Sequence, residues 1–412
     1  MICTDVNIPQ MQCRKANNLK NLEKTKELVL GLCDMDTVLK LFNGNEGVSY
    51  IYHKDNPILL GSQFLLKVNT SVGISEPCEL NEELRKIEAI TSVYYAPDLI
   101  MDHTQNIGLK NSLWRHLIEK VNVPIGAVPV YSVFDEMKGI DKSFLLDTIQ
   151  EMAEGGVSLM TFHPTATREL YDLAKKTRGI PVSSWGGGVV LQDMVVNNRE
   201  HNIIDEVFSD ILAILKKYNV TISIGSVFRP AGIIDALDQV HLQETKEQKK
   251  YIDLAKTNEV NVIMEGIGHI DLGLISKYCD IIRPYKTPLM PLGPIPTDVS
   301  IGYDHVSGII GAYKAVEQGV VGIINSVTRA EHLGSVPTTE DVFEGLMNAR
   351  TLAHAINLTR FEYYRQLDTN IYNNRASGRT CMANGGLFNI SPNPENRQGC
   401  HRCGVQCPLT LL

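Results

Sequence analysis

Residues 143–165, "SFLLDTIQEMAEGGVSLMTFHPT", contain the unit that decides the fold. Residues 143–156 have apolar side chains at helical spacing and end in two glycines, which predicts a helix that stops there. The apolar run that follows is short and ends at a histidine and a proline, which predicts a buried strand. A helix followed by a strand is part of the repeat from which parallel sheets are built.

The same alternation extends in both directions along the chain. Helical patterns separate the apolar runs, for example at 169–179 and 203–219, where the second ends in two lysines and an asparagine. About eight strand–helix units over roughly 280 residues predict an α/β fold, a (β/α)8 barrel, with one run surplus. The alternative is an open doubly wound sheet, although the glycine-rich stretches do not match the dinucleotide-binding fingerprint. The nine runs are 64–73, 98–104, 125–131, 157–165, 180–188, 220–230, 261–269, 287–294 and 319–328.

The two ends of the chain do not share this alternation. Residues 1–60, with a helical pattern at 21–44 and a short strand pattern at 48–56, are interpreted as a small N-terminal domain. The barrel is predicted to span 61–345. Residues 346–412 are predicted to hold C-terminal helices, a mobile linker rich in Asn, Gly, Ser and Pro, and a cysteine-containing tail.

Composition excludes some classes of partner. The 412 residues carry a formal net charge of −8 and show no long basic run, so we expect no nucleic-acid partner. No run of 18 or more apolar residues predicts a membrane span, and the N-terminus has no apolar signal-peptide core. We therefore expect a cytoplasmic protein whose scattered cysteines are reduced.

Polar or functional side chains follow nearly every predicted strand. Because the strand ends of a parallel barrel meet on one face, these side chains are predicted to converge. Each one alone is more often a cap or a loop residue, and it is the recurrence that favours a site. They are Ser71, Met101, Asp102, His103, Tyr131, His163, Ser184, Trp185, Ser226, Arg229, Glu265, His269 and Met290.

The glycine-rich stretch 185–190, "WGGGVV", follows one of the predicted strands. Its glycines could turn successive backbone N–H groups into a nest for a phosphate, and the alternative is a flexible loop. Arg229 follows the next strand and could pair with the same phosphate through two hydrogen bonds.

Two histidines end separate motifs, His269 in "EGIGH" and His305 in "GYDH". They could ligate one divalent metal, zinc or iron, with water or substrate completing the shell. Two ligands do not define a metal site, so structural histidines remain the alternative.

The last residues hold the densest group of thiols, Cys400, Cys403 and Cys407. Iron–sulfur cubanes usually take four cysteines, so three thiolates would leave one iron open to a substrate or cofactor. The alternative is a structural zinc knuckle with His401 as the fourth ligand, which is awkward because His401 adjoins Cys400.

Several motifs together resemble the thiamin pyrimidine synthase family, a non-canonical group of radical S-adenosylmethionine (SAM) enzymes. The resemblance covers about residues 60 to 360 and, in kind, the three-cysteine tail. The motifs are "VNTSVGIS" (68–75), "PIGAVPVY" (124–131), "MEGIGH" (264–269), "LGPIPTDVSIGYDH" (292–305) and "RAEHLGSVPTTEDV" (329–342).

This resemblance implies a fold, cofactors and a reaction. It implies a (β/α)8 barrel and a mobile tail whose [4Fe–4S] cluster, on Cys400, Cys403 and Cys407, covers the active site of the partner subunit in a homodimer. An electron donor would reduce the cluster, SAM would be split, and the 5′-deoxyadenosyl radical would take hydrogen from the ribose of 5-aminoimidazole ribotide. It also implies a second metal, zinc or iron, on His269 and His305.

The resemblance assigns residues as well. Glu265, Tyr131 and His163 would be catalytic. The positions that would contact substrate are Ser71, Met101, Tyr131, His163, Ser184, Trp185, Gly186, Ser226, Val227, Phe228, Arg229, Glu265 and Met290.

The chain departs from the thiamin enzymes at several of these positions. Ser71 stands in place of Asn, Trp185 of Arg, Ser-Val-Phe at 226–228 of Asp-Gly-Leu, Met290 of Tyr, and Ile267 of Pro. Three residues rather than four separate the last two cysteines. Changed charge and volume in a closed pocket would steer a radical intermediate differently.

A sister branch of the family makes 5-hydroxybenzimidazole from the same ribotide, for the lower ligand of cobamides. The departures favour that activity as the prediction for this chain. Thiamin pyrimidine synthase, also called phosphomethylpyrimidine synthase, is the alternative within the class. From other classes, the chain could be a zinc-bound, non-radical barrel lyase or a partner subunit that is inactive alone.

Overall fold

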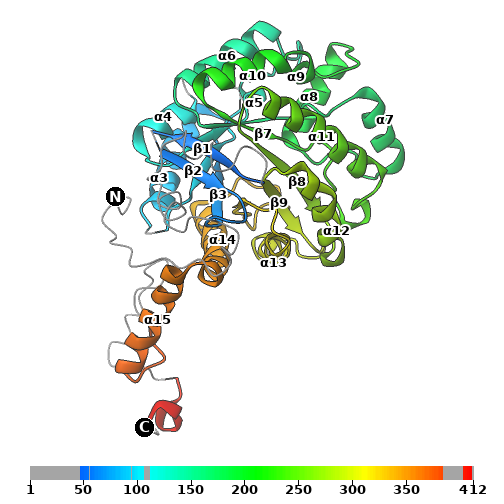
Figure 1. Ribbon diagram of the computed structural model, residues 1–412. Coiled ribbons are helices and arrows are strands. Elements are labelled where there is room, and N and C mark those ends of the chain that lie inside the picture. The colour runs from blue at the N-terminus through cyan, green and yellow to red at the C-terminus, as the bar shows by residue number, and fades with distance from the viewer. Residues whose placement is uncertain (1–46, 55, 94, 106–111, 384–401, 411–412) are drawn as a thin grey trace.

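The computed structural model describes residues 47–54, 56–93, 95–105, 112–383 and 402–410. Eight parallel strands form one sheet in the order β10-β3-β4-β5-β6-β7-β8-β9. Hydrogen bonds from Leu289 N to Val320 O (2.8 Å) and from Gly322 N to Leu289 O (3.1 Å) join β9 to the segment before β10 and close the barrel. The predicted (β/α)8 barrel is therefore confirmed, and the open doubly wound sheet is wrong (Figure 1).

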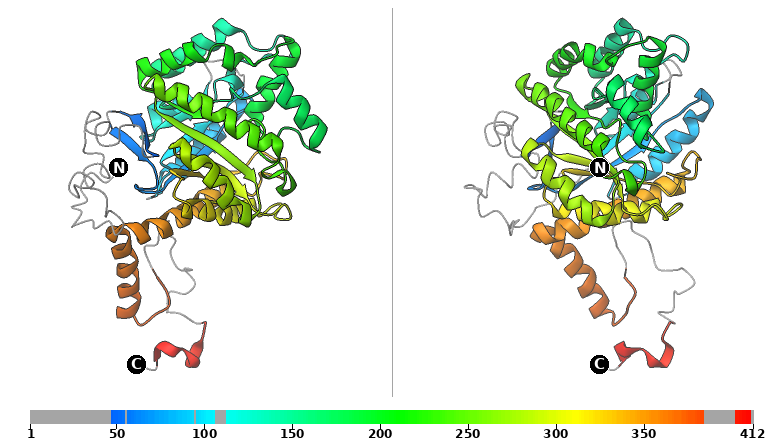
Figure 2. Two further views of the ribbon diagram at one scale, coloured as in Figure 1. Left: turned by 45° about the vertical axis from the view of Figure 1, so that its right-hand side comes forward. Right: turned by 90° about the vertical axis from the view of Figure 1, so that its right-hand side faces the viewer.

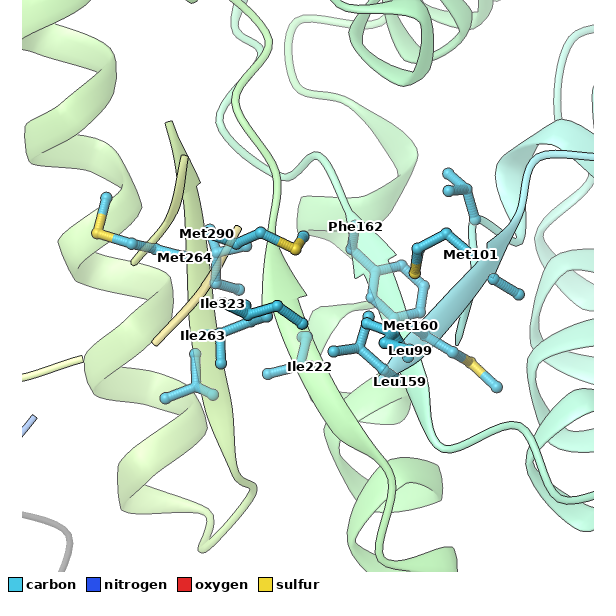
Figure 3. Packing of buried hydrophobic residues seen from close by; sticks show 14 of the residues in the cluster. Leu99, Met101, Leu159, Met160, Phe162, Ile222, Ile263, Met264, Met290 and Ile323 are labelled. Carbon is cyan, nitrogen blue, oxygen red and sulfur yellow. The ribbon is translucent and has the colours of Figure 1, made fainter. Parts of the chain in front are cut away.

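Eight of the nine predicted strands are present, and they make up the whole barrel. They are β3 (Lys67–Val72), β4 (Leu99–Asp102), β5 (Ile125–Ala127), β6 (Leu159–Phe162), β7 (Thr221–Ile224), β8 (Val262–His269), β9 (Leu289–Ile295) and β10 (Ile323–Asn325). The barrel interior is filled by strand side chains such as Leu99, Phe162 and Ile222, all fully buried (Figure 3). Burial on this scale is the main force that holds the strands in register.

The run at 180–188 is the surplus one, and its prediction as a strand is wrong. Ser184 is instead the N-cap of helix α8 (Trp185–Val196), and its hydroxyl accepts a hydrogen bond from Gly187 N at 3.1 Å. The capping bond stabilises the first turn of a helix there. The glycines of "WGGG" therefore lie in that turn and do not form a flexible loop, while an anion site at the turn stays a prediction.

Helices separate the strands as predicted and cover the outside of the barrel (Figures 1 and 2). The predicted helix at 203–219 is divided at Val207 into α9 and α10, and α10 ends at Asn219 in the left-handed conformation (φ 54°). The α-helices other than α8, α14 and α15 are α3 (Leu80–Thr91), α4 (Leu113–Lys120), α5 (Val130–Val133), α6 (Lys142–Glu154), α7 (Arg168–Thr177), α9 (Ile203–Glu206), α10 (Phe208–Tyr218), α11 (Gln239–Thr257), α12 (Leu272–Ile282) and α13 (Asp304–Glu317).

A β-hairpin precedes the barrel. Strand β1 (Ser49–His53), predicted from 48–56, pairs with β2 (Asn56–Leu60). The hairpin is fixed to the start of β7 because the Thr221 hydroxyl donates to Tyr50 O at 2.5 Å. The predicted helix at 21–44 lies outside the described residues, so the prediction of a separate N-terminal domain is untested.

Two helices follow the barrel strands. Helix α14 (Thr339–Arg360) packs against α3, α13 and β3, so the predicted boundary at 345/346 lies within it. Helix α15 (Glu362–Ser377) has no buried residue, and it stands away from the barrel in all three views, as does segment 402–410 (Figures 1 and 2). It extends to Ser377, so it includes the first residues of the Asn-rich stretch that the composition predicts to be a linker. No helix in the described part of the chain is long and apolar enough to cross a membrane.

Candidate active site

A cavity of about 550 Å³ opens at the carboxyl ends of the barrel strands. Residues from all eight strand–loop units line it, which confirms that residues far apart in sequence converge here. Of the side chains predicted at strand ends or as substrate contacts, those lining the cavity are Ser71, Met101, His103, Tyr131, His163, Ser184, Trp185, Arg229, Glu265, His269 and Met290. The predicted residues that are not among those lining it are Asp102, Gly186, Ser226, Val227, Phe228 and His305.

Glu265, on β8, is the acidic group deepest in the strand layer. Its Oε1 accepts hydrogen bonds from the Thr161 hydroxyl on β6 (2.8 Å) and the Ser223 hydroxyl on β7 (2.9 Å). The carboxyl group is 6% exposed, and burial raises its pKa although both hydroxyls oppose that shift. One of its two oxygens is thus fixed by hydroxyls from two neighbouring strands.

His163 follows β6, and its ring packs closely against Gly186 and Gly225. A Cβ added at Gly186 would lie 2.3 Å from His163 Cε1, and one at Gly225 would lie 2.7 Å from its Cδ2 and Nε2. Burial, with help from the Arg229 charge, lowers the pKa of His163 to about 3. The ring is therefore neutral near pH 7 and can be placed only where both glycines allow it. This explains why Gly186 belongs to the site without lining the cavity.

Three aromatic rings form one wall. The Trp185 indole stacks on the Tyr131 phenol, with centroids 4.2 Å apart and planes inclined by 21°. The His103 ring is edge-on to that of Tyr131, with centroids 5.9 Å apart and planes inclined by 84°. Burial raises the Tyr131 pKa, so the phenol is un-ionised near neutral pH. The wall is apolar at its centre and carries hydrogen-bonding groups at its edge.

Arg229, in the loop after β7, lines the cavity. Its Nη1 donates to Ser226 O at 3.2 Å and its Nη2 to Ser183 O at 3.5 Å, so it reaches the segment that leads into α8. Ser184 caps that helix. A helix N-terminus beside an arginine is a good site for an anion such as a phosphate.

Two charged residues that the sequence analysis missed bind the loop after β7 on its side away from the cavity. Fully buried Glu244 on α11 accepts hydrogen bonds from Ser226 Oγ (2.6 Å), Phe228 N (2.8 Å) and Val227 N. These bonds explain why the predicted substrate contacts at 226–228 do not line the cavity. Burial raises the Glu244 pKa, against the effect of its hydrogen bonds.

Arg178 is the second missed residue. Its side chain is 1% exposed, donates to Phe228 O at 2.6 Å, and pairs with both Asp238 carboxylate oxygens at 2.7 Å. Asp238 is also the N-cap of α11. Helix α11 therefore positions the β7 loop in two ways. Asp238 at its start acts through Arg178, and Glu244 in its second turn binds the loop directly.

One of the two predicted metal ligands, His269, lies near a third histidine, whereas His305 Nε2 is 3.6 Å from Glu344 Oε1. His269 Nδ1 is 2.8 Å from Asp298 Oδ1, and the His269 ring lies 4.9 Å, centroid to centroid, from that of His332. His332 Nδ1 is 2.7 Å from Oδ1 of Asp304, the residue before His305. No three potential ligands converge into a ready metal site among the described residues. A metal shared by His269 and His305 stays a prediction.

The thiols of the tail are only partly described. Cys403 and Cys407 flank one 3-10 turn, where Gln406 N donates to Cys403 O (3.1 Å) and Cys407 N to Gly404 O (3.3 Å). Neither forms a disulfide in the described part of the chain; Cys403 is exposed and Cys407 is half-buried. Cys400 lies outside the described residues. Thiols held at the ends of a short turn suit the iron atoms of a [4Fe–4S] cluster.

Comparison with known proteins decides the family. Residues 48–412 match the radical SAM ThiC family. The chain belongs to the radical SAM ThiC family. It is similar to the phosphomethylpyrimidine synthase of Carboxydothermus hydrogenoformans, with 34% identity over 87% of this chain and 86% of that protein. The synthases of Pyrococcus furiosus and Methanopyrus kandleri are each 30% identical to this chain. Each comparison covers 86% of this chain and 86% of the other protein.

Membership in the ThiC family implies a [4Fe–4S] cluster and SAM as cofactors. Ligation of that cluster by Cys400, Cys403 and Cys407 stays a prediction. The curated relatives named above are phosphomethylpyrimidine synthases, so they do not support the more specific prediction of the benzimidazole branch.

Proposed function

We propose that this ThiC-family chain is a phosphomethylpyrimidine synthase, acting on 5-aminoimidazole ribotide. The observation that carries the proposal is the 34% identity to a synthase of that name over nearly the full length of both chains. The cavity agrees with it, because Met101, Tyr131, His163, Arg229 and Glu265 line one space of suitable size.

In this proposal the ribotide phosphate binds between Arg229 and the N-terminus of α8. The guanidinium and the positive end of the helix dipole supply the favourable charge. The imidazole ring lies against Tyr131 on the aromatic wall, and the neutral ring of His163 offers a hydrogen bond. Glu265, fixed by two hydroxyls, holds or accepts a proton at the ribose. When bound, the cluster and SAM supply the radical that takes hydrogen from the sugar.

A second candidate is 5-hydroxybenzimidazole synthase, and the Trp185–Tyr131 stack favours it. The thiamin enzymes have a cationic Arg where this chain places an indole against the phenol. Ser226, which stands in place of their Asp, gives its hydroxyl to Glu244 and offers nothing to the cavity. Missing polar contacts cost a reaction path about 1–3 kcal/mol each when they are buried. The pocket is therefore less suited to the rearrangement of the thiamin enzymes.

One anaerobic reaction tests both candidates. It contains reconstituted protein, ribotide, SAM and a strong reductant, and products are identified by mass spectrometry. Hydroxymethylpyrimidine phosphate supports the first candidate, and 5-hydroxybenzimidazole supports the second. Formation of 5′-deoxyadenosine without either product would indicate a missing partner subunit. Full activity in protein that holds zinc and no iron would instead support a non-radical barrel lyase.

We further propose that His269 and His305 bind one zinc or iron ion. Support comes from His332, whose ring neighbours that of His269 and whose Nδ1 contacts Asp304, the residue before His305. The test is the metal content of the reconstituted protein and of a His269→Ala variant. Loss of one ion per chain is expected, while His116→Ala on α4 should keep it; equal content in all three contradicts the site.

The homodimer with exchanged tails is also a proposal. It is supported by α15, which has no buried residue and stands away from its own barrel with the segment 402–410 (Figure 2). Mixing two inactive variants tests it. Cys407→Ala, defective in the tail, and Glu265→Gln, defective in the barrel, should restore part of the activity when co-folded. No recovery would mean that each tail serves its own barrel.

A further inference from the structure

Glu244 is a buried acid that holds four donors from outside the cavity. It is 0% exposed, and it accepts hydrogen bonds from Thr165 Oγ1 (2.8 Å), Ser226 Oγ (2.6 Å), Phe228 N (2.8 Å) and Val227 N. Each carboxylate oxygen takes one hydroxyl and one backbone N–H. The two N–H groups cannot reverse their direction, so only an acceptor on both sides satisfies them.

These donors belong to two different active-site loops. Thr165 lies two residues after His163, at the end of β6. Ser226 to Phe228 directly precede Arg229, after β7. Gly225, at the start of the same loop, packs against the His163 imidazole. A single carboxylate therefore joins the loop of the neutral histidine to the loop of the cavity arginine.

We propose that Glu244 is a positioning residue that fixes Arg229 relative to His163, and so sets the affinity of the cavity for its phosphorylated ligand. The identity of that ligand rests on the proposed function. Glu244 does not line the cavity, so it acts through the two loops and not on the substrate. Ser226 contributes by donating, whereas the Asp of the thiamin enzymes would place a second acid beside this one.

The variant Glu244→Gln tests the inference with little change in volume. Its NH2 group would face a backbone N–H, whichever way the amide turns, and the β7 loop would have to move. We expect KM for the ribotide, and its dissociation constant measured by calorimetry on the reconstituted holoenzyme, to rise about tenfold or more. The kcat at saturating ribotide should fall much less. The matched control is Glu247→Gln on the same helix, which contacts neither loop.

A double-mutant cycle separates positioning from a general loss of structure. If Glu244 acts through Arg229, adding Glu244→Gln to Arg229→Ala should raise KM little further. Fully additive effects, or an unchanged KM in Glu244→Gln, would overturn the inference.

A readout that needs no ligand covers the case in which the proposed function itself fails. In protein with ¹⁵N-labelled histidine, His163 is assigned by the signal lost in His163→Gln. Glu244→Gln should shift that ring signal, and Glu247→Gln should not. A wild type that does not bind ribotide contradicts the proposed function alone. An unmoved His163 signal contradicts the positioning role, whatever the ligand.

Discussion

Trp185 and Tyr131 stack 4.2 Å apart, centroid to centroid, at the cavity mouth. The two rings come from different parts of the barrel: Tyr131 lies in α5 after β5, and Trp185 is the first residue of α8. The indole is 46% exposed, so it shields one side of a phenol that is otherwise buried. The stack therefore places an indole, and not a charged side chain, at this edge of the cavity.

Replacing Trp185 should therefore change both turnover and product. Trp185→Phe retains a ring and should keep most activity, whereas Trp185→Ala should lose about 0.5–1.5 kcal/mol of stacking and up to about tenfold in kcat/KM. Trp185→Arg should raise the ratio of pyrimidine phosphate to benzimidazole in the mass spectrum. Equal activity in the Ala and Phe variants would show that the stack has no role.

Gly186 and Gly188 lie in the same turn but have different surroundings, so alanine substitutions at the two positions can be compared directly. Gly186→Ala would place a methyl group within 2.3 Å of the His163 ring, so it should destabilise the protein by about 1–3 kcal/mol and abolish activity. A Cβ at Gly188 meets nothing within 4 Å, so Gly188→Ala should stabilise α8 by up to about 1 kcal/mol and leave activity unchanged. Thermal melting and turnover measure both. Similar melting temperatures for the two variants would contradict the packing described for His163.

Ionisation of Glu265 should set the lower pH limit of kcat/KM. Burial raises its pKa, so if the ionised form is required, kcat/KM falls as pH falls through a value above the ordinary 4.5. Thr161→Val removes a donor that favours the ionised form and should move this limb to still higher pH. Glu265→Gln should lose the limb along with most activity. A limb that stays in place in Thr161→Val would mean that another group is titrating.

His241 offers a test of stability away from the cavity. It lies on α11, stacked on Tyr278, and burial lowers its pKa to about 3. Between pH 6.5 and 3 the unfolded chain binds a proton there that the folded chain does not, so stability falls as pH falls. The slope is about 1.4 kcal/mol per pH unit for one such group.

His241→Gln should therefore flatten the fall of the free energy of unfolding between pH 6.5 and 4, measured by denaturant titration. It is expected to be less stable than wild type at pH 7, because a packed ring is lost. His201→Gln, at a largely exposed ring, is the control. Parallel pH profiles for wild type and His241→Gln would count against the buried neutral ring.

The tail should account for the iron. After anaerobic reconstitution we expect about four irons per chain, falling to near none in Cys407→Ala. Cys381→Ser changes an exposed thiol outside the three-cysteine motif and should keep the iron. Elemental analysis and the visible absorbance of the cluster measure the difference. Retained iron in Cys407→Ala would place the cluster elsewhere.

Sequence periodicity was enough for the barrel, because each strand is a short apolar run bounded by turn residues. It failed at 180–188, where an apolar start and three glycines imitate a strand and its loop. The deciding feature is the Ser184 cap, a local bond that favours a helix and competes with strand pairing. The prediction of one helix over 203–219 was also wrong, because α9 ends before Val207 and α10 begins after it.

The site was predictable where a side chain follows a strand, as for Glu265 and Arg229. Glu244 and Arg178 lie in or beside helices that read as ordinary polar surfaces, and only packing shows that they are buried. Ser226 was placed in the cavity by sequence, but its hydroxyl turns to Glu244. Such choices depend on contacts between distant segments, which no local pattern contains.

The strand order has a consequence for how the protein is made. Strand β10 lies between β9 and β3, so both of those strands keep an unpaired edge until residues after 320 have left the ribosome. A nascent chain that already holds seven strands exposes two apolar edges, which are templates for pairing with other chains. Truncation before Ile323–Asn325 should therefore yield aggregates and not a smaller soluble barrel, and slower synthesis or chaperones should matter most for the final quarter of translation.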